Sequence, residues 1–254
     1  MGIKGHFRIG SSEHDYVINL DKNWYNYWLS KDTDFGTNGT YTISGNLYTD
    51  NWWPSPVLTH GKPAKSQDMQ MTGWHIADTV SFLNNKVQVL AGIHGQRAEQ
   101  TKAGSSTKKY DGINPTFAVN YKWTPDFSSY ISHSENFNVG TMVGSGYANY
   151  GELLDPTKTK QNEFGFKYKN GRILHTLSFF RIKQANYNNV TIDGELYYKA
   201  YGEQTDKGIE YTAAGTLSDK MDFVGGFQYM NARQALTGKA VNGAAKWSAT
   251  AAVI

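Results

Sequence analysis

The chain has 254 residues, of which 25 are basic and 22 acidic, a formal net charge of +3 and no cysteine. This near balance of charge gives no reason to expect a nucleic acid or an acidic partner, and the lack of cysteine excludes disulfides, thiolate metal sites and cysteine nucleophiles. Aromatic residues make up 14% of the chain and glycine occupies 26 positions, yet the mean hydropathy is −0.57. Such a composition suits short alternating strands joined by polar loops better than a helical bundle.

The chain shows neither a recognisable signal peptide at its start nor an apolar run of about 20 residues that could form a transmembrane helix. A β-barrel can cross a membrane without either feature, because only alternate residues of each strand face the lipid.

Alternating side chains predict strands along most of the chain. Toward the N-terminus the predicted strands cover residues 4–10, 15–20 and 41–48, followed by a proline-containing loop at 49–68 that carries Trp52 and Trp53. From residue 72 the alternation becomes regular, with Asp78 as the exception on the apolar face of the first of these strands and with weaker alternation at 127–134. The further strands are predicted at 74–82, 87–93, 117–123, 127–134, 163–169, 172–179, 209–213, 221–229 and 247–254.

The clearest element is a β-hairpin over residues 163–179. Phe164, Phe166 and Tyr168 alternate with Glu163, Gly165 and Lys167, so one face of the first strand is aromatic and the other is small or charged. Asn170-Gly171 is the dipeptide that best accepts a two-residue type I′ turn. That turn predicts a register in which Phe166 faces His175 and Phe164 faces Leu177.

The connections between the predicted strands alternate in length. Tight connections at 84–85, 124–126, 170–171 and 217–220 alternate with long ones at 95–113, 135–160, 184–206 and 232–245. In an up-and-down meander every second connection lies at the same edge, so one edge has tight turns and the other long polar loops. This is the layout of an outer-membrane β-barrel, whereas a soluble sandwich or lectin would mix connection lengths and crossings.

Several segments resemble one family, in the family's order along the chain. Residues 154–167 (LDPTKTKQNEFGFK), 177–181 (LSFFR) and 207–210 (KGIE) are similar to segments of the TonB-dependent outer-membrane receptors, in particular the ferric-siderophore receptors. Shorter agreements occur at 77–79, 130–132, 225–226 and 231–233.

The resemblance implies a fold. Family members are barrels of about 22 strands with an N-terminal plug domain, and this chain has room for about 11 to 13 strands. We therefore expect an all-β, antiparallel up-and-down segment of a transmembrane β-barrel. Residues 1–254 would be part of the barrel domain from its C-terminal half, and the plug domain would be absent.

The resemblance also implies a function, with no catalytic residues and no resident cofactor. We expect uptake of a ferric siderophore across the outer membrane of a Gram-negative bacterium, with energy supplied by the TonB complex through the missing plug, and with outer-membrane lipid around the barrel. A passive porin-like barrel and a soluble carbohydrate-binding β-protein remain the alternatives.

Two groups of residues are candidate sites. Exposed aromatic side chains in long connections could hold a flat, iron-bound ligand, or they could form an interfacial aromatic girdle: Trp52, Trp53, Tyr147 and Tyr150. Polar or small residues on the non-aromatic faces could line the transport lumen, or serve only hydrogen bonding and packing: Glu163, Gly165, Lys167, Gly208 and Glu210. The seven histidines show no metal-ligand spacing, and residues 132–134 (SHS) lack the elbow sequence of a serine nucleophile.

Overall fold

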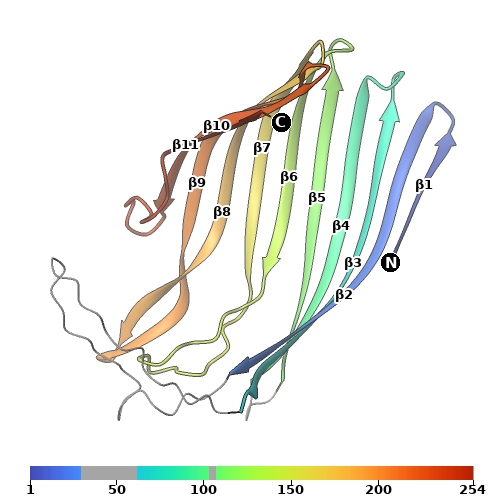
Figure 1. Ribbon diagram of the computed structural model, residues 1–254. Helices are drawn as coiled ribbons and strands as arrows, with labels where there is room; N and C mark the ends of the chain where they lie inside the picture. The colour runs from blue at the N-terminus through green and yellow to red at the C-terminus, as the bar shows by residue number, and fades with distance from the viewer. Residues whose placement is uncertain (30–61, 103–106, 254) are drawn as a thin grey trace. The chain divides into compact units, whose positions relative to one another are not determined.

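The computed structural model describes residues 1–29, 62–102 and 107–253. These residues are all-β: eleven strands form one sheet whose order follows the chain from β1 to β11. Figure 1 shows the strands side by side, and every strand pairing that the structure defines is antiparallel. Within these residues, no helix has the length and apolar character needed to cross a membrane. The expected all-β, up-and-down architecture is confirmed.

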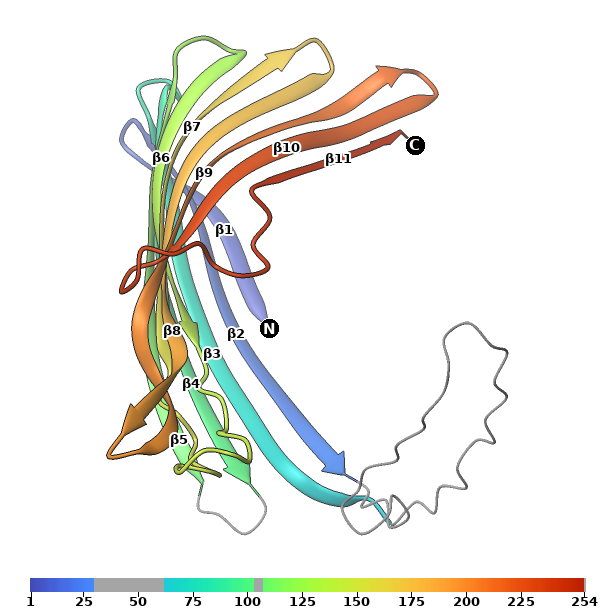
Figure 2. The same ribbon diagram turned by 90° about the vertical axis from the view of Figure 1, so that its left-hand side faces the viewer.

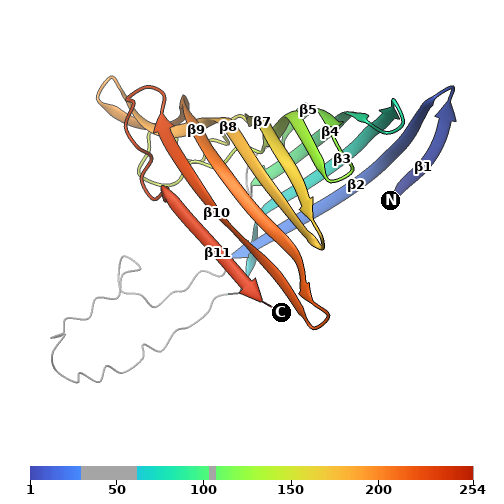
Figure 3. The ribbon, with the colours of Figure 1, turned by 90° about the horizontal axis from the view of Figure 1, so that it is seen from above.

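The strands are long for a globular protein, several of them exceeding a dozen residues. Their bounds are β1 (Gly2–Ile9), β2 (Ser12–Leu29), β3 (Ala64–Phe82), β4 (Val87–Lys102), β5 (Lys108–Lys122), β6 (Phe127–Asn138), β7 (Thr157–Asn170), β8 (Ile173–Ile192), β9 (Glu195–Ser218), β10 (Met221–Gln234) and β11 (Trp247–Val253). Strands β1 and β11 are the two edges of the sheet, as Figure 3 shows.

The chain divides into two compact units. The larger contains residues 1–22, 72–98 and 110–254, and therefore all of β6 to β11. The smaller contains residues 23–71 and 99–109, whose described part comprises the remaining ends of β2 to β5. In the smaller unit, ion pairs join Lys65 to Asp68 at 2.7 Å and Lys109 to Glu99 at 3.2 Å. The candidate sites described below all belong to the larger unit.

Four predicted tight connections are confirmed in position. They occur at 83–86, 123–126, 171–172 and 219–220, and the turns that follow β7 and β9 can be followed in Figure 2. Residues 84 and 85 are asparagines with φ of 54° and 65°, the left-handed conformation that asparagine tolerates better than most residues.

The hairpin of β7 and β8 has the predicted faces but a different register. Asn170 is paired with Ile173, and the turn consists of Gly171 and Arg172, so Phe166 faces Leu177 and not His175. Gly171, the first residue of this turn, has a φ of 61°, in the left-handed region that glycine adopts readily. The slip relative to the prediction is two residues, and an even slip leaves every side chain on its predicted face.

Two of the predicted long connections are wrong in extent. Strands β8 and β9 continue through 184–206 and meet in a tight turn at Asp193 and Gly194, whose φ angles are 50° and 84°. Similarly, β4 and β5 occupy most of 95–113, and only 103–106, outside the described residues, separates them. These strand ends carry polar side chains on both faces, so they lack the apolar alternation by which strands are recognised.

The N-terminal region was predicted less well. Strand β2 extends through the aromatic-rich residues 23–29, and β3 includes residues 64–68, where the sequence predicts a loop. The predicted strand at 41–48 lies outside the described residues, as do Trp52 and Trp53.

Glycines opposite aromatic residues fix the packing of neighbouring strands. Gly165 is paired with Tyr130, and a Cβ at Gly165 would lie 2.6 Å from the Tyr130 ring. Gly208 is paired with Phe180, whose ring occupies the space that a Cβ would need. For both glycines the sequence left lumen lining and packing open; in the structure each lies directly against an aromatic ring of the neighbouring strand.

We expect replacement of Gly165 by alanine to destabilise the folded protein by about 1–3 kcal/mol, the usual cost of overpacking a well-filled site. The reason is that the Tyr130 ring would have to move, and its hydroxyl is held by Glu163. Urea-induced unfolding of the protein in lipid vesicles measures the change in the free energy of unfolding.

Gly144 supplies the control, since nothing lies within 4 Å of a Cβ built there and its φ is not positive. Gly144→Ala should change the free energy of unfolding by less than about 0.5 kcal/mol. If Gly165→Ala were equally harmless, or if its cost persisted in a Tyr130→Ala background, the packing role would be refuted.

Candidate functional site

The sheet of the larger unit has two chemically different faces. The aromatic face carries Phe164, Phe166 and Tyr168 of β7, and the paired rows continue it to Ile131 on β6 and Phe179 on β8. These side chains are substantially exposed, including Ile131 at 57%, Phe164 at 43% and Phe179 at 40%. A contiguous exposed apolar surface of this kind marks contact with a membrane or a partner.

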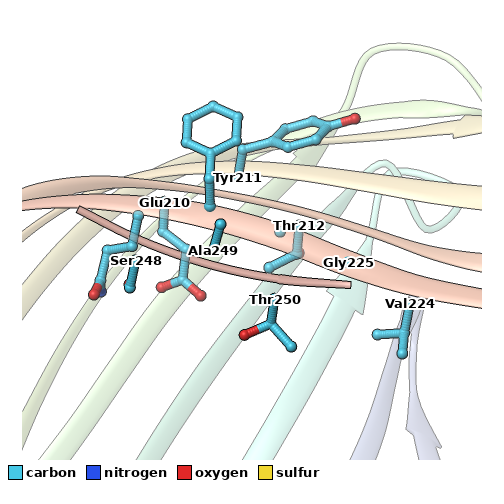
Figure 4. Close-up of a pocket in the computed structure, with 11 residues that line it drawn as sticks. Glu210, Tyr211, Thr212, Val224, Gly225, Ser248, Ala249 and Thr250 are labelled. Carbon is cyan, nitrogen blue, oxygen red and sulfur yellow. The ribbon is translucent and has the colours of Figure 1, made fainter. Parts of the chain in front are cut away.

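The opposite side, the polar face, carries the residues that lie between the aromatic ones. Figure 4 shows the separation on β9 to β11: Tyr211 projects to one side of the sheet, while Glu210, Ser248 and Thr250 project to the other. On β3 to β5 the polar face continues, because the Gln88 amide donates to Ser81 at 3.4 Å and accepts from Asn120 at 3.2 Å.

Glu163 is the centre of a hydrogen-bond cluster on the polar face. The Tyr130 hydroxyl donates to one carboxylate oxygen of Glu163, and the Gln161 amide donates to the other at 3.0 Å. The Lys167 ammonium lies 5.1 Å from the centre of the Tyr130 ring, within cation–π range. The structure thus brings the predicted residues Glu163, Gly165 and Lys167 together around the one ring of Tyr130. Sequence reasoning missed Tyr130 as a site residue, because its contact with Glu163 depends on the pairing register of β6 and β7.

The other predicted polar residues, Gly208 and Glu210, lie on β9. Glu210 is paired with Ser178 on one side and Gln228 on the other. It borders a shallow cavity of about 260 Å³ next to the edge strand β11, shown in Figure 4. Small residues at Gly225, Gly226 and Ala249 leave this space open.

Tyr147 and Tyr150 lie in the connection between β6 and β7, which folds onto itself. An antiparallel bridge joins Met142 to Leu153, and the Val143 amide donates to the Glu152 carbonyl at 2.8 Å. Val143 is only 1% exposed, so the connection has a small core of its own.

This connection is docked on β9. The Asn149 side chain accepts from the Tyr198 amide at 3.1 Å and donates to the Tyr198 carbonyl at 2.9 Å, much as a neighbouring strand would. The amide of Ala148 also donates to the Leu196 carbonyl at 2.8 Å. Backbone groups beyond the regular ladder are therefore satisfied by side chains and by the connection itself.

Tyrosine rings hold the docked connection in place. The Tyr147 ring lies 5.3 Å from that of Tyr198, and its hydroxyl donates to Asn189 at 2.9 Å. The Tyr187 ring lies 5.9 Å from Tyr198, and its hydroxyl donates to the Asp155 carbonyl at 2.8 Å. Burial raises the pKa of the Tyr187 hydroxyl above its ordinary value, so Tyr187 stays a neutral donor at physiological pH. Tyr147 is thus packed, whereas Tyr150 is 63% exposed.

A second cavity lies at the outer ends of β8 and β9. It has a volume of about 210 Å³ and a lining rich in amides, with one carboxylate and one exposed tyrosine: Asn186, Asn188, Asn189, Gln234, Glu203 and Tyr201. Sequence reasoning missed it because the segment was assigned to a long connection, although its asparagine run was visible.

Two pairs of polar side chains lie on the aromatic face. His14 and Asp78 lie 2.7 Å apart, which accounts for the aspartate that interrupts the apolar alternation of β3. His175 and the Tyr211 hydroxyl are likewise 2.7 Å apart. Across the part of the chain that the structure describes, no group of three or more His, Asp and Glu side chains could hold a metal ion.

Comparison with known proteins identifies the fold. The family described as TonB dependent receptor-like, beta-barrel, matches residues 5–253. The chain is 26% identical over 235 residues to the ferrichrome receptor FcuA of Yersinia enterocolitica, and 25% identical over 242 residues to the ferrichrome outer membrane transporter/phage receptor of Escherichia coli K12. These alignments cover 84% and 91% of this chain, but only 29% and 31% of the relatives.

Among solved structures, the chain is similar to the crystal structure of BauA, the ferric preacinetobactin receptor from Acinetobacter baumannii. The TM-score is 0.77 at 26% identity, and the match covers 99% of this chain and 39% of BauA. Because the family match extends over nearly the whole chain and agrees with the eleven antiparallel strands, the protein belongs to the TonB-dependent receptor β-barrel family of the Gram-negative outer membrane.

Proposed function

We propose that the protein is a receptor and transporter for a ferric siderophore, energised through TonB, in which this chain supplies part of the barrel. The observation that carries the proposal is the family match over residues 5–253, together with relatives that are named for ferrichrome. The ligand is a ferric siderophore as a class, and we assign the chain no enzymatic activity and no resident cofactor. The partners are the TonB complex, acting through a plug outside residues 1–254, and outer-membrane lipid.

In this proposal the aromatic face meets lipid and the polar face lines the transport path. An outer-membrane barrel needs an apolar band outside and polar groups inside, and the alternation of β6 to β10 supplies both. Glu163, Lys167 and Glu210 would then face the lumen, and Gly165 and Gly208 would admit the aromatic rings beside them.

We further propose that the ligand-binding end lies at the long connections. Tyr150 would contact the ligand, since its ring is exposed, and Tyr147 would support it by holding the connection on β9. Trp52 and Trp53 remain proposed ligand contacts, outside the described residues.

Iron uptake should require both the protein and TonB. Cells that make the protein should accumulate radioactive iron supplied as ferrichrome, or as ferrioxamine B, and should stop doing so when TonB is deleted. Uptake that continues without TonB would point to a passive porin. Failure with every siderophore, while a sugar quenches the tryptophan fluorescence of the protein, would favour the carbohydrate-binding alternative.

The two faces should differ in their access to water. The chain has no cysteine, so single cysteines at Lys167 and Phe164 are clean probes. A membrane-impermeant maleimide, applied to cells with a permeabilised outer membrane, should label Lys167→Cys, whereas Phe164→Cys should react only after detergent extraction. The reverse pattern would invert the proposed orientation of the sheet.

Replacing Tyr150 with alanine should weaken ferric-siderophore binding by roughly tenfold, the effect of losing about 1.4 kcal/mol of aromatic contact, with little change in folding. Tyr168→Ala is the matched control, because Tyr168 is also exposed, at 49%, but lies beside the tight turn. Equal losses in both variants, measured by equilibrium binding in detergent, would remove Tyr150 from the site.

A further inference from the structure

Two cations face each other on the aromatic face without an acidic partner. Arg181 of β8 and Lys207 of β9 are directly paired in the sheet, and both are exposed. Over the described residues, neither side chain makes a hydrogen bond or an ion pair. Like charges directly opposite each other on neighbouring strands destabilise a sheet. An anion from outside the chain that bound both side chains would remove this repulsion.

The next row of the same face shows the usual solution to this problem. Lys160 and Lys183 are also directly paired, across β7 and β8. Each of them has an acid nearby: Lys160 lies 2.9 Å from Glu135, and Lys183 lies 3.9 Å from Glu203. Two like-charged pairs thus lie in adjacent rows, and only the pair nearer the apolar residues lacks compensation.

Arg181, one member of the uncompensated pair, lines an apolar cavity. Its volume is about 420 Å³, and its lining combines the apolar side chains of Phe117, Ile131, Phe164 and Phe179 with polar residues that include Arg181, His133, Asn162 and Glu163. Arg181 follows Phe179 by two residues, and Lys207 precedes Ile209 by two, so the cations end the apolar rows of their strands. His133 and Asn162, whose side chains are 2.8 Å apart, continue the polar lining across β6 and β7.

We propose that Arg181 and Lys207 bind the phosphate of a membrane lipid whose acyl chain lies on Phe164 and Phe179. The inference rests on the proposed lipid contact of the aromatic face and not on siderophore transport. A lipid phosphate would bind the two cations while its acyl chain covered the apolar side chains beside them. Free phosphate would bind the cations but leave those apolar side chains exposed. Guanidinium and ammonium groups are suited to phosphate oxygens, the first as a fork of donors and the second as a point charge.

The test compares lipids that differ in headgroup charge. The purified protein is placed in nanodiscs of phosphatidylcholine with a minor fraction of phosphatidic acid, and the lipids that remain bound after transfer to detergent are identified by native mass spectrometry. The unmodified protein should be enriched in phosphatidic acid. Joint replacement Arg181→Gln and Lys207→Gln should lower that preference by roughly 30-fold, the combined effect of two basic side chains near an anionic headgroup.

The matched control is Lys160→Gln with Lys183→Gln, which removes the same number of charges from the compensated row. This variant should keep its preference for phosphatidic acid. A third variant, Asn162→Glu, leaves both cations in place but sets a carboxylate directly opposite Arg181, and it should lose the preference as well.

Three results would overturn the proposal: enrichment that survives the Arg181 and Lys207 replacements, an equal loss in the control pair, or displacement of the lipid by excess inorganic phosphate alone. Heat-modifiable migration on gels shows whether each variant is folded, and Asn162→Glu tests the site without removing a cation. Ferric-siderophore binding measured on the same samples should not change, so failure of this inference is distinct from failure of the proposed function.

Discussion

The antiparallel hydrogen-bond ladder is the constraint on which the rest of the structure depends. A chain that passes through hydrocarbon has no water to satisfy its backbone, so each strand must find its partners in its neighbours. The sequential order from β1 to β11 achieves this with connections that join adjacent strands only. Once the ladder exists, side chains must alternate between two faces, and the separation of aromatic from polar residues follows from that geometry.

The ladder also explains the glycines and their aromatic partners. On the polar face, Tyr130 and Phe180 lie over Gly165 and Gly208, where a Cβ would collide with the ring. A large ring over a glycine fills the space that the missing side chain leaves and lets its polar end reach a neighbour. The Tyr130 hydroxyl reaches Glu163 in this way, so packing and hydrogen bonding on the polar face depend on the same cross-strand pair.

Sequence alone predicted the faces more reliably than the lengths of the strands. Alternation placed Phe164 and Glu163 on opposite faces correctly, and the two-residue slip in the hairpin left that assignment intact. It failed between residues 184 and 206 of β8 and β9, where both faces carry polar side chains. It also could not foresee Tyr130 beside Glu163, or Tyr147 beside Asn189, since these contacts depend on the pairing register and on a connection folding back.

The polar side chains of the aromatic face have different partners at different positions along the strands. Among the apolar rows, His14 is paired with Asp78 and His175 with Tyr211, because a lone polar group in hydrocarbon costs several kcal/mol. At the end of those rows Arg181 and Lys207 face each other without an acid, and one row further Lys160 and Lys183 have one each. An unpaired cation is costly in hydrocarbon, and so is a cation directly opposite another cation. Both costs fall when an anion from outside the chain binds the pair. If Arg181 and Lys207 bind a lipid phosphate as proposed, their row would correspond to the depth at which hydrocarbon gives way to charged headgroups, and the rows beyond it, including the docked connection of Tyr147, would lie on the aqueous side.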